Sequence, residues 1–165
     1  MAEKIASQEK VTEEFDLEKN VTIISIAKSL TGFNRINSIG AVTIPPKGKV
    51  RVSRNEILSQ VQNNNIHLCG KGNGAHATYY IDDAPTRIYL GFDSEDGTVK
   101  QNVFTDEKVK DIFAIKSQSA FENAFNEAFV TDIEKEALMD ALQRLKINDY
   151  ARIRFAEQRT GKTMM

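Results

Sequence analysis

The chain has 165 residues, with 22 Lys and Arg against 23 Asp and Glu, 41% hydrophobic residues, one Cys and no Trp. These values are typical of a globular protein with one domain, or one domain and an appendage, which can bury a core without disulfides or a structural metal. The single cysteine excludes an intramolecular disulfide and any zinc site built from several cysteines. No run reaches the roughly 18 apolar residues of a membrane span, and the first ten residues lack the apolar stretch of a signal peptide. We therefore expect synthesis in the cytoplasm and no membrane partner.

Charge is distributed unevenly along the chain. Residues 1–19 carry six acids against three lysines and few large apolar residues, which predicts a flexible acidic N-terminal arm. Residues 20–55 contain no acid and six basic residues, and the stretch from residue 144 has six basic residues against two acids. The acidic arm and these basic segments could meet within one chain or between subunits.

Residues 20–104 are predicted to form an antiparallel β domain with one short helix. Residues 21–27 are β-branched and apolar and predict a strand, whereas the turn formers of residues 29–40 predict a loop. Residues 41–53 alternate in polarity around Pro45 and Pro46, and they predict a hairpin or a strand corner.

The rest of this domain is predicted from caps and from alternating polarity. Ser53 and Glu56 have the spacing of a capping box and predict a short helix that ends near residues 63–65. Further strands are expected at residues 66–69, 77–81, 87–92 and 98–104, the last two joined by a turn at residues 93–97.

Residues 105–165 are predicted to form a C-terminal helical region. Helix starts are indicated by Thr105, by Ser119 with Glu122, and by Thr131 with Glu134. A last helix is expected from about residue 148 to residue 159, with Gly161 as its terminator. The predicted fold class is therefore α+β: an antiparallel β-sandwich or barrel of about six strands, followed by three or four short helices.

Histidine and cysteine define one candidate enzymatic site. His67, Cys69 and His76 are the only His and Cys residues, and a strand would place His67 and Cys69 on one face. A zinc site or a Cys/His nucleophile pair is conceivable, but no second Cys pair or HExxH pattern accompanies these residues. We expect no metal and no cofactor.

Two other patterns have simpler interpretations. The glycines of CGKGNGAH lack the spacing and the strand-to-helix context of a phosphate-binding loop, so they predict a long hairpin loop. The acids of residues 82–83 and 93–96 do not reproduce a calcium-binding loop, and they predict turns and backbone caps.

The basic residues of the acid-free stretch are the main candidates for partner binding. Lys49 and Arg51 alternate with Val50 and Val52, so they share one face with the nearby Lys47. This face could contact phosphates, which leaves open a nucleic-acid-binding module that uses residues 47–54. A subunit interface, in which the acidic arm of a neighbour pairs with this face, explains it equally well. The predicted partner-binding residues are Lys47, Lys49, Arg51, Arg54, Arg152 and Arg154.

Four segments together suggest a class of protein. They are the charged arm before VTIISIA, the segment TIPPKGKVRVSRNEI, the run GNGAHATYYIDDAPTRIYLGF and the helical ending NDYARIRFAEQRTG. In style, the chain resembles the small accessory proteins of tailed-bacteriophage particles, which are capsid decoration proteins and head-to-tail connector components. The resemblance implies a non-enzymatic virion protein, with capsid or connector proteins as partners and with many copies or a homo-oligomer on the assembly.

Overall fold

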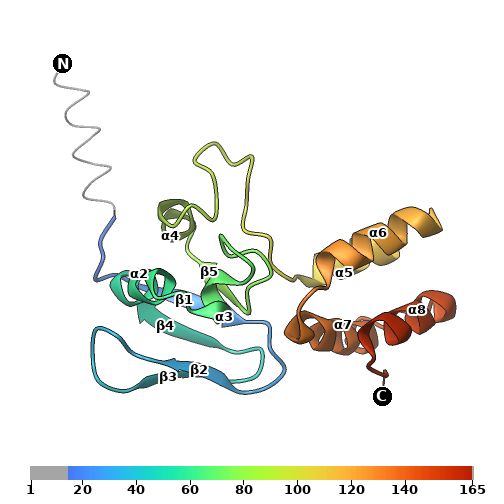
Figure 1. The fold of residues 1–165 in the computed structure, drawn as a ribbon, viewed down its shortest axis with the longest axis horizontal. Coiled ribbons are helices and arrows are strands. Elements are labelled where there is room, and N and C mark those ends of the chain that lie inside the picture. Colours follow the sequence, from blue (N-terminus) through green and yellow to red (C-terminus); the bar gives the residue numbers. More distant parts are fainter. Residues whose placement is uncertain (1–14, 165) are drawn as a thin grey trace.

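The structure, a computed structural model, describes residues 15–164. In this part of the chain the fold is mixed α+β, with five strands in two antiparallel sheets and seven helices. Figure 1 shows two lobes along the long axis, which we name the β lobe (residues 15–104) and the helical lobe (residues 105–164). Each lobe has its own cluster of buried apolar side chains.

The β lobe is built on a three-stranded sheet. β1 (Asn20–Ser25) lies in the centre and pairs with β4 (Lys49–Ser53) and β5 (Tyr79–Asp82). Ile23 lies opposite Val50 and Ile81, so its row of side chains belongs to the core face. The strands at residues 21–27 and 77–81 were therefore correctly predicted, with small shifts of their ends.

A two-stranded hairpin covers the inner face of this sheet. β2 (Thr31–Asn34) pairs with β3 (Ala41–Ile44), and Val42 and Ile44 join the core of the sheet. The segment 29–40, predicted as a loop, thus contains a strand. α2 (Arg54–Gln62) and α3 (Ile66–Cys69) complete the core with Ile57 and Leu68. The sheets form no closed barrel within residues 15–164, and the expected six-stranded sandwich or barrel is not confirmed.

The predicted strand at residues 66–69 is a helix, and the one at residues 87–92 is the last part of a helix followed by a turn, because capping side chains precede them. The Asn65 side chain accepts a hydrogen bond from the His67 N–H and starts α3 over residues 66–69. Asp83 accepts one from the Thr86 N–H, and with Pro85 in the first turn it starts α4 (Ala84–Tyr89). The apolar alternation of residues 87–92 is typical of a strand, but the Asp83 cap starts a helix that runs into this segment.

The predicted hairpin over residues 87–104 is also wrong. Its turn exists, because the Ser94 N–H donates to the Val99 carbonyl. Beyond it the Gln101 N–H donates to the Asp93 carboxylate (2.7 Å), and residues 101–105 run toward the helical lobe instead of pairing with a strand.

The helical lobe confirms the prediction of three or four short helices. It contains four in the described residues: α5 (Asp106–Phe113), α6 (Gln118–Ala128), α7 (Asp132–Arg144) and α8 (Tyr150–Thr160). Thr105 caps α5, Thr131 and Glu134 form the expected capping box of α7, and Gly161 ends α8 at φ 69°. The cap of α6 lies two residues before the predicted one, since Ser117 rather than Ser119 caps the helix. In the core of this lobe Phe113 packs edge to face on Phe121 and on Phe125, and the Phe121 and Phe125 rings are tilted against each other.

The described chain begins on the β lobe. The Phe15 ring stacks on Tyr89 of α4 with 4.2 Å between ring centres. The Leu17 and Lys19 carbonyls accept hydrogen bonds from the Asn55 and Arg54 N–H groups. The predicted flexible arm, residues 1–19, otherwise falls outside the described residues.

Candidate binding groove between the two lobes

The outer face of the three-stranded sheet carries the predicted basic residues. Paired residues of neighbouring strands project to the same side, so Lys49, Ile24 and Tyr80 form one row across the sheet. Arg51 lies beside Thr22 in the next row, and the Lys49 and Arg51 side chains are exposed. This face combines positive charge with partly buried apolar and aromatic groups.

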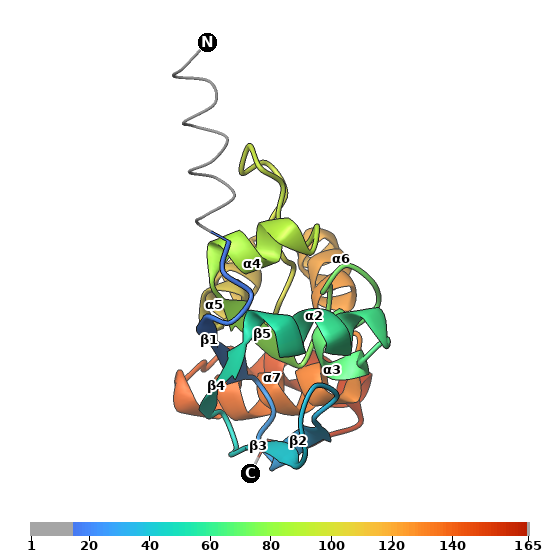
Figure 2. The same cartoon turned by 90° about the vertical axis from the view of Figure 1, so that its left-hand side faces the viewer.

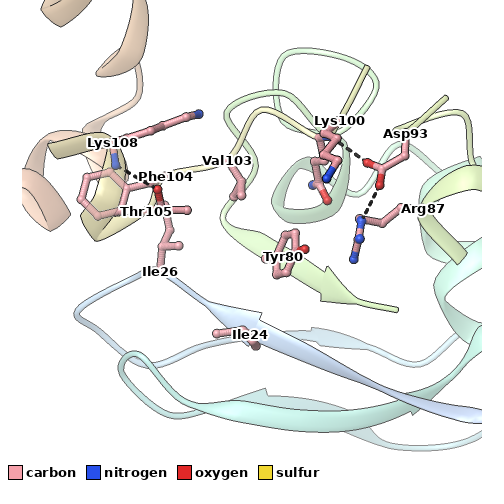
Figure 3. A pocket seen from close by; sticks show the side chains of 11 residues that line it. Ile24, Ile26, Tyr80, Arg87, Asp93, Lys100, Val103, Phe104, Thr105 and Lys108 are labelled. Carbon is pink, nitrogen blue, oxygen red and sulfur yellow. Dashed lines mark hydrogen bonds and ion pairs between the residues drawn. The ribbon is translucent and has the colours of Figure 1, made fainter. Parts of the chain in front are cut away.

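A cavity of about 460 Å³ lies where this face meets the segment that leads to the helical lobe. In Figure 3, Arg87 and Asp93 lie at one end of the cavity, Phe104 and Lys108 lie at the other, and Tyr80 lies between them. The apolar part of its lining comes from the sheet and from the end of the β lobe that leads to the helical lobe: Ile24, Ile26, Tyr80, Val103 and Phe104.

An ordered network fixes the first end of the cavity. The Arg87 guanidinium lies over the Tyr80 ring, 4.9 Å from its centre, and Nε donates to Asp93 Oδ2 (2.9 Å). The Arg87 NH1 group donates to the Ile81 carbonyl (2.6 Å), while Asp93 Oδ1 accepts the Gln101 N–H. Both carboxylate oxygens of Asp93 are therefore occupied.

Lysines supply further charge. Lys108 donates to the neutral Asn102 side chain, and burial lowers the pKa of its ammonium group. Among residues 15–164, Lys49 and Lys100 have no ion-pair partner. Lys49 is exposed on the outer face of the sheet and Lys100 is exposed on the cavity wall.

A second cavity, of about 440 Å³, continues the first. The two share Ile24, Ile26, Phe104 and Thr105 in their linings. The second is bounded by Lys47 from the β lobe and by Asp106 and Arg144 from the helical lobe. We call the two cavities together the interlobe groove.

Ion pairs close this second part. Lys47 pairs with Asp140 of α7, and Arg144 pairs with Asp106 (2.6 Å). Burial lowers the pKa of Lys47, and the nearby Arg144 charge lowers it further. The Arg144 hydrogen bonds hold the pKa of Asp106 below its usual value. The groove as a whole is lined by five cations (Lys47, Arg87, Lys100, Lys108 and Arg144) and two carboxylates (Asp93 and Asp106).

The structure brings together only part of the predicted partner-binding set. Lys47, Lys49 and Arg51 lie on or beside the groove, with Lys49 and Arg51 on the outer sheet face. Arg154 is exposed on α8 and donates to the Tyr150 hydroxyl (3.0 Å), so it belongs to another surface.

Arg54 and Arg152 are interior residues. Arg54 is 1% exposed and donates to Asp83 (2.8 Å) and Thr86 (3.1 Å). Arg152 is 9% exposed, donates to the Phe113 carbonyl (2.9 Å) and lies over the Phe121 ring. As interior residues they cannot offer charge to a partner, because their side chains hold elements of the same chain together.

Sequence reasoning missed most groove residues. Arg87, Lys100 and Lys108 lie in segments that do not look basic, and Arg144, the first residue of the basic C-terminal stretch, was not among the predicted partner-binding residues. Arg87 and Lys100 also fall in the segments that were wrongly predicted as strands. The only signal was the alternation of Lys49 and Arg51, which located the sheet face but not the cavity.

The His and Cys residues do not gather at one site. His67 Nδ1 lies 3.0 Å from the Thr78 hydroxyl, and His76 Nδ1 lies 2.9 Å from Glu134 Oε2. The Cys69 thiol faces the Val61 carbonyl. Burial lowers the pKa of His67 and raises that of Cys69. Within residues 15–164, no three His, Cys, Asp or Glu side chains are placed to hold a metal ion.

Comparison with known proteins gives no further assignment. No family model matches the chain, and no curated protein or solved structure is detectably similar to it. Among the described helices, none has the length and apolar character required to cross a bilayer.

Proposed function

We propose that this protein is a non-enzymatic structural component of a viral particle, most specifically a capsid decoration protein that binds the shell and neighbouring subunits. The observation that carries the proposal is a loop outside the core that is anchored by hydrogen bonds and exposes two isoleucines. This loop, residues 35–40, joins β2 and β3.

A buried carboxylate anchors the loop. Glu56 is 2% exposed, and its two oxygens accept the Ile36 N–H (2.7 Å) and the Asn37 N–H (3.0 Å). The neighbouring Gln60 side chain donates to the Asn34 carbonyl and to Glu56. Two side chains of α2 thus hold the backbone at the start of the loop, at Asn34, Ile36 and Asn37.

The anchored loop presents isoleucine to solvent. Ile39 is fully exposed and Ile36 is 46% exposed, although each would gain about 2 kcal/mol from burial. A preorganised loop loses little conformational entropy when it docks, so it suits a protein that must bind a fixed surface. This arrangement supports docking through the hairpin.

Particle composition tests the proposal. Quantitative mass spectrometry of gradient-purified particles should find about one copy per shell subunit, because decoration follows the symmetry of the shell. About a dozen copies per particle would support the alternative, a head-to-tail connector or ring component. Complete absence from particles would overturn both forms of the proposal.

Reconstitution tests the loop itself. Particles stripped of the protein should bind the purified chain, and Ile39→Ser should weaken that binding at least about tenfold, equal to about 1.4 kcal/mol. Val99→Ser, at another exposed apolar side chain on the turn of residues 94–99, is the matched control and should bind normally. Unchanged binding of Ile39→Ser would remove the loop from the docking surface.

A nucleic-acid-binding module is the second candidate. The exposed Lys49 and Arg51 lie on the same sheet face as Tyr80, a combination that can contact phosphates and bases. Binding of single-stranded DNA should then fall steeply with salt and disappear in Lys49→Glu/Arg51→Glu. Binding that is absent or insensitive to salt would exclude this candidate.

A further inference from the structure

We propose that the interlobe groove binds the acidic N-terminal segment, residues 1–14, of a second copy of the chain. The inference rests on the proposed function, because it describes how copies of a particle protein contact one another. The proposed docking loop at residues 35–40 would contact the shell, whereas the groove would contact a neighbouring copy of the chain.

The charge of the groove favours an acidic occupant. Its two carboxylates are already paired, Asp93 with Arg87 and Asp106 with Arg144. Lys100 and Lys108 make no ion pair among residues 15–164: the Lys108 ammonium group donates to the neutral Asn102 side chain, and the Glu134 carboxylate acts on it without forming an ion pair. The two lysines therefore add positive charge that no ion pair of the described chain neutralises.

The lining of the groove also favours a peptide over a small anion. Ile24, Ile26 and Phe104 form an apolar surface that runs through both cavities. A bound segment could place carboxylates against the lysines and apolar side chains against this surface. Such a combination gives both selectivity and buried apolar area.

The sequence of residues 1–14 matches these requirements. The segment contains four glutamates against two lysines, and three of the glutamates fall within residues 9–14. Ile5 and Val11 lie among the charged residues and supply apolar side chains. Fully extended, 14 residues span about 45–50 Å, enough to cross from one molecule to the next.

The position of residue 15 favours a neighbouring molecule. Phe15 is held between Tyr89 and the Arg54 guanidinium, 4.6 Å from its ring centre. Figure 1 shows the described chain beginning at the end of the β lobe away from the helical lobe, and Figure 2 shows this side of the β lobe facing the viewer, whereas the groove lies between the lobes. To enter its own groove the segment would have to turn back along the whole length of β1.

A charge swap in the full-length chain tests the proposal. The groove variant is Lys100→Glu/Lys108→Glu, and the segment variant is Glu9→Lys/Glu13→Lys/Glu14→Lys. Each variant alone should weaken self-association at least tenfold in sedimentation velocity runs at low salt. Mixing the two should restore association between the unlike copies, because the reversed segment of one fits the reversed groove of the other. Lys110→Glu/Lys116→Glu, with the same charge change on exposed lysines of the helical lobe, should associate like the unmodified chain.

Other outcomes overturn the inference. A full-length chain that stays monomeric at high micromolar concentration would exclude exchange between copies. This holds also if the segment then occupies the groove of its own molecule. Association that survives both variants would place the interface elsewhere. A groove variant that associates normally but loses binding to single-stranded DNA would assign the groove to nucleic acid. Circular dichroism of each variant must match the unmodified chain.

The proposed function and this inference fail in different experiments. If particles contain the protein but neither charge variant changes association, only the inference falls. If the charge swap restores association but particles lack the protein, the groove exchange stands and the particle role falls.

Discussion

Arg54 lies in the most basic stretch of the sequence, yet its side chain is almost completely enclosed. It connects three segments: it donates to Asp83 at the start of α4, belongs to the first turn of α2 and lies over Phe15. Burial raises the pKa of Asp83, but hydrogen bonds from Thr86 and Arg54 outweigh it and lower the pKa overall. The pair is therefore ionised and internal.

Arg54→Ala should be strongly destabilising. The substitution leaves the Asp83 carboxylate without its cation in a largely buried position, at a cost of about 3 kcal/mol in the free energy of unfolding. Urea denaturation measures the change. Arg51→Ala, an exposed position three residues earlier, is the control and should change the value by less than about 0.5 kcal/mol. Equal effects of the two substitutions would contradict the structural role of Arg54.

Glu56 should make the docking loop sensitive to acid. Burial alone would raise its pKa, but hydrogen bonds from Ile36, Gln60 and Asn37 bring the pKa below the ordinary value of 4.5. Because the folded pKa is depressed, the stabilising contribution is complete above pH 4.5 and is lost as the pH falls through the folded pKa. Hydrogen exchange of the Ile36 and Asn37 amides should accelerate in that acidic range relative to the exchange rate of an unstructured peptide.

Glu56→Gln provides the matched comparison for the same loop. Its amide group would face one of the two backbone donors and leave it unpaired, which costs about 1–3 kcal/mol. Protection of the loop should then be low at neutral pH and change little on acidification. A variant with normal protection at neutral pH would show that the carboxylate does not hold the loop.

The β2–β3 hairpin depends on one close backbone approach. A Cβ atom at Gly32 would lie 2.4 Å from the Val42 carbonyl oxygen, so no side chain fits without moving the strand. Gly32→Ala should cost about 1–3 kcal/mol of stability and reduce amide protection in β3. Thr43→Ala, on the exposed side of β3 opposite Gly32, is the control and should leave the protection pattern intact. Normal amide protection in Gly32→Ala would mean that β2 and β3 can move apart slightly without losing their hydrogen bonds.

Local sequence signals predicted the helices better than the strands. Caps such as Ser53, Thr105 and Thr131 act within one turn, so their residues alone locate a helix start. The segments 66–69 and 87–92 have strand-like alternation, but Asn65 and Asp83 cap helices there. The partner of a strand depends on distant residues, which is why the pairing of β3 with β2 instead of β4 could not be read from residues 41–53.

At the scale of the molecule, one ion pair and one histidine–carboxylate hydrogen bond join lobes that have separate cores. His76 contacts Glu134 at the start of α7, and Lys47 contacts Asp140 near its end. These pairs bring together residues 58 and 93 positions apart in the sequence. The groove exists only because the lobes meet in this way, and no local pattern could have predicted it.

Removing both pairs should loosen the lobes without unfolding them. Lys47 and His76 have φ of 52° and 58°, so Asn, which tolerates this region, is the suitable replacement. Lys47→Asn/His76→Asn should keep the circular dichroism spectrum, increase the radius of gyration in small-angle X-ray scattering and change stability by about 1 kcal/mol or less. An unchanged radius would show that the apolar lining of the groove suffices to fix the lobes.

Residue 15 and the groove lie on different parts of one molecule, and this separation determines what kind of assembly such a contact can build. Where a molecule gives its segment to one neighbour and receives a segment from another, the contact is heterologous; repeating it generates a ring if the rotation per step divides a full turn, and an open helical filament otherwise. Where two molecules exchange segments reciprocally, the contact closes as a twofold dimer. In either case the groove lies between lobes that the His76–Glu134 and Lys47–Asp140 contacts join, so a change in the angle between the lobes would change the geometry of the assembly.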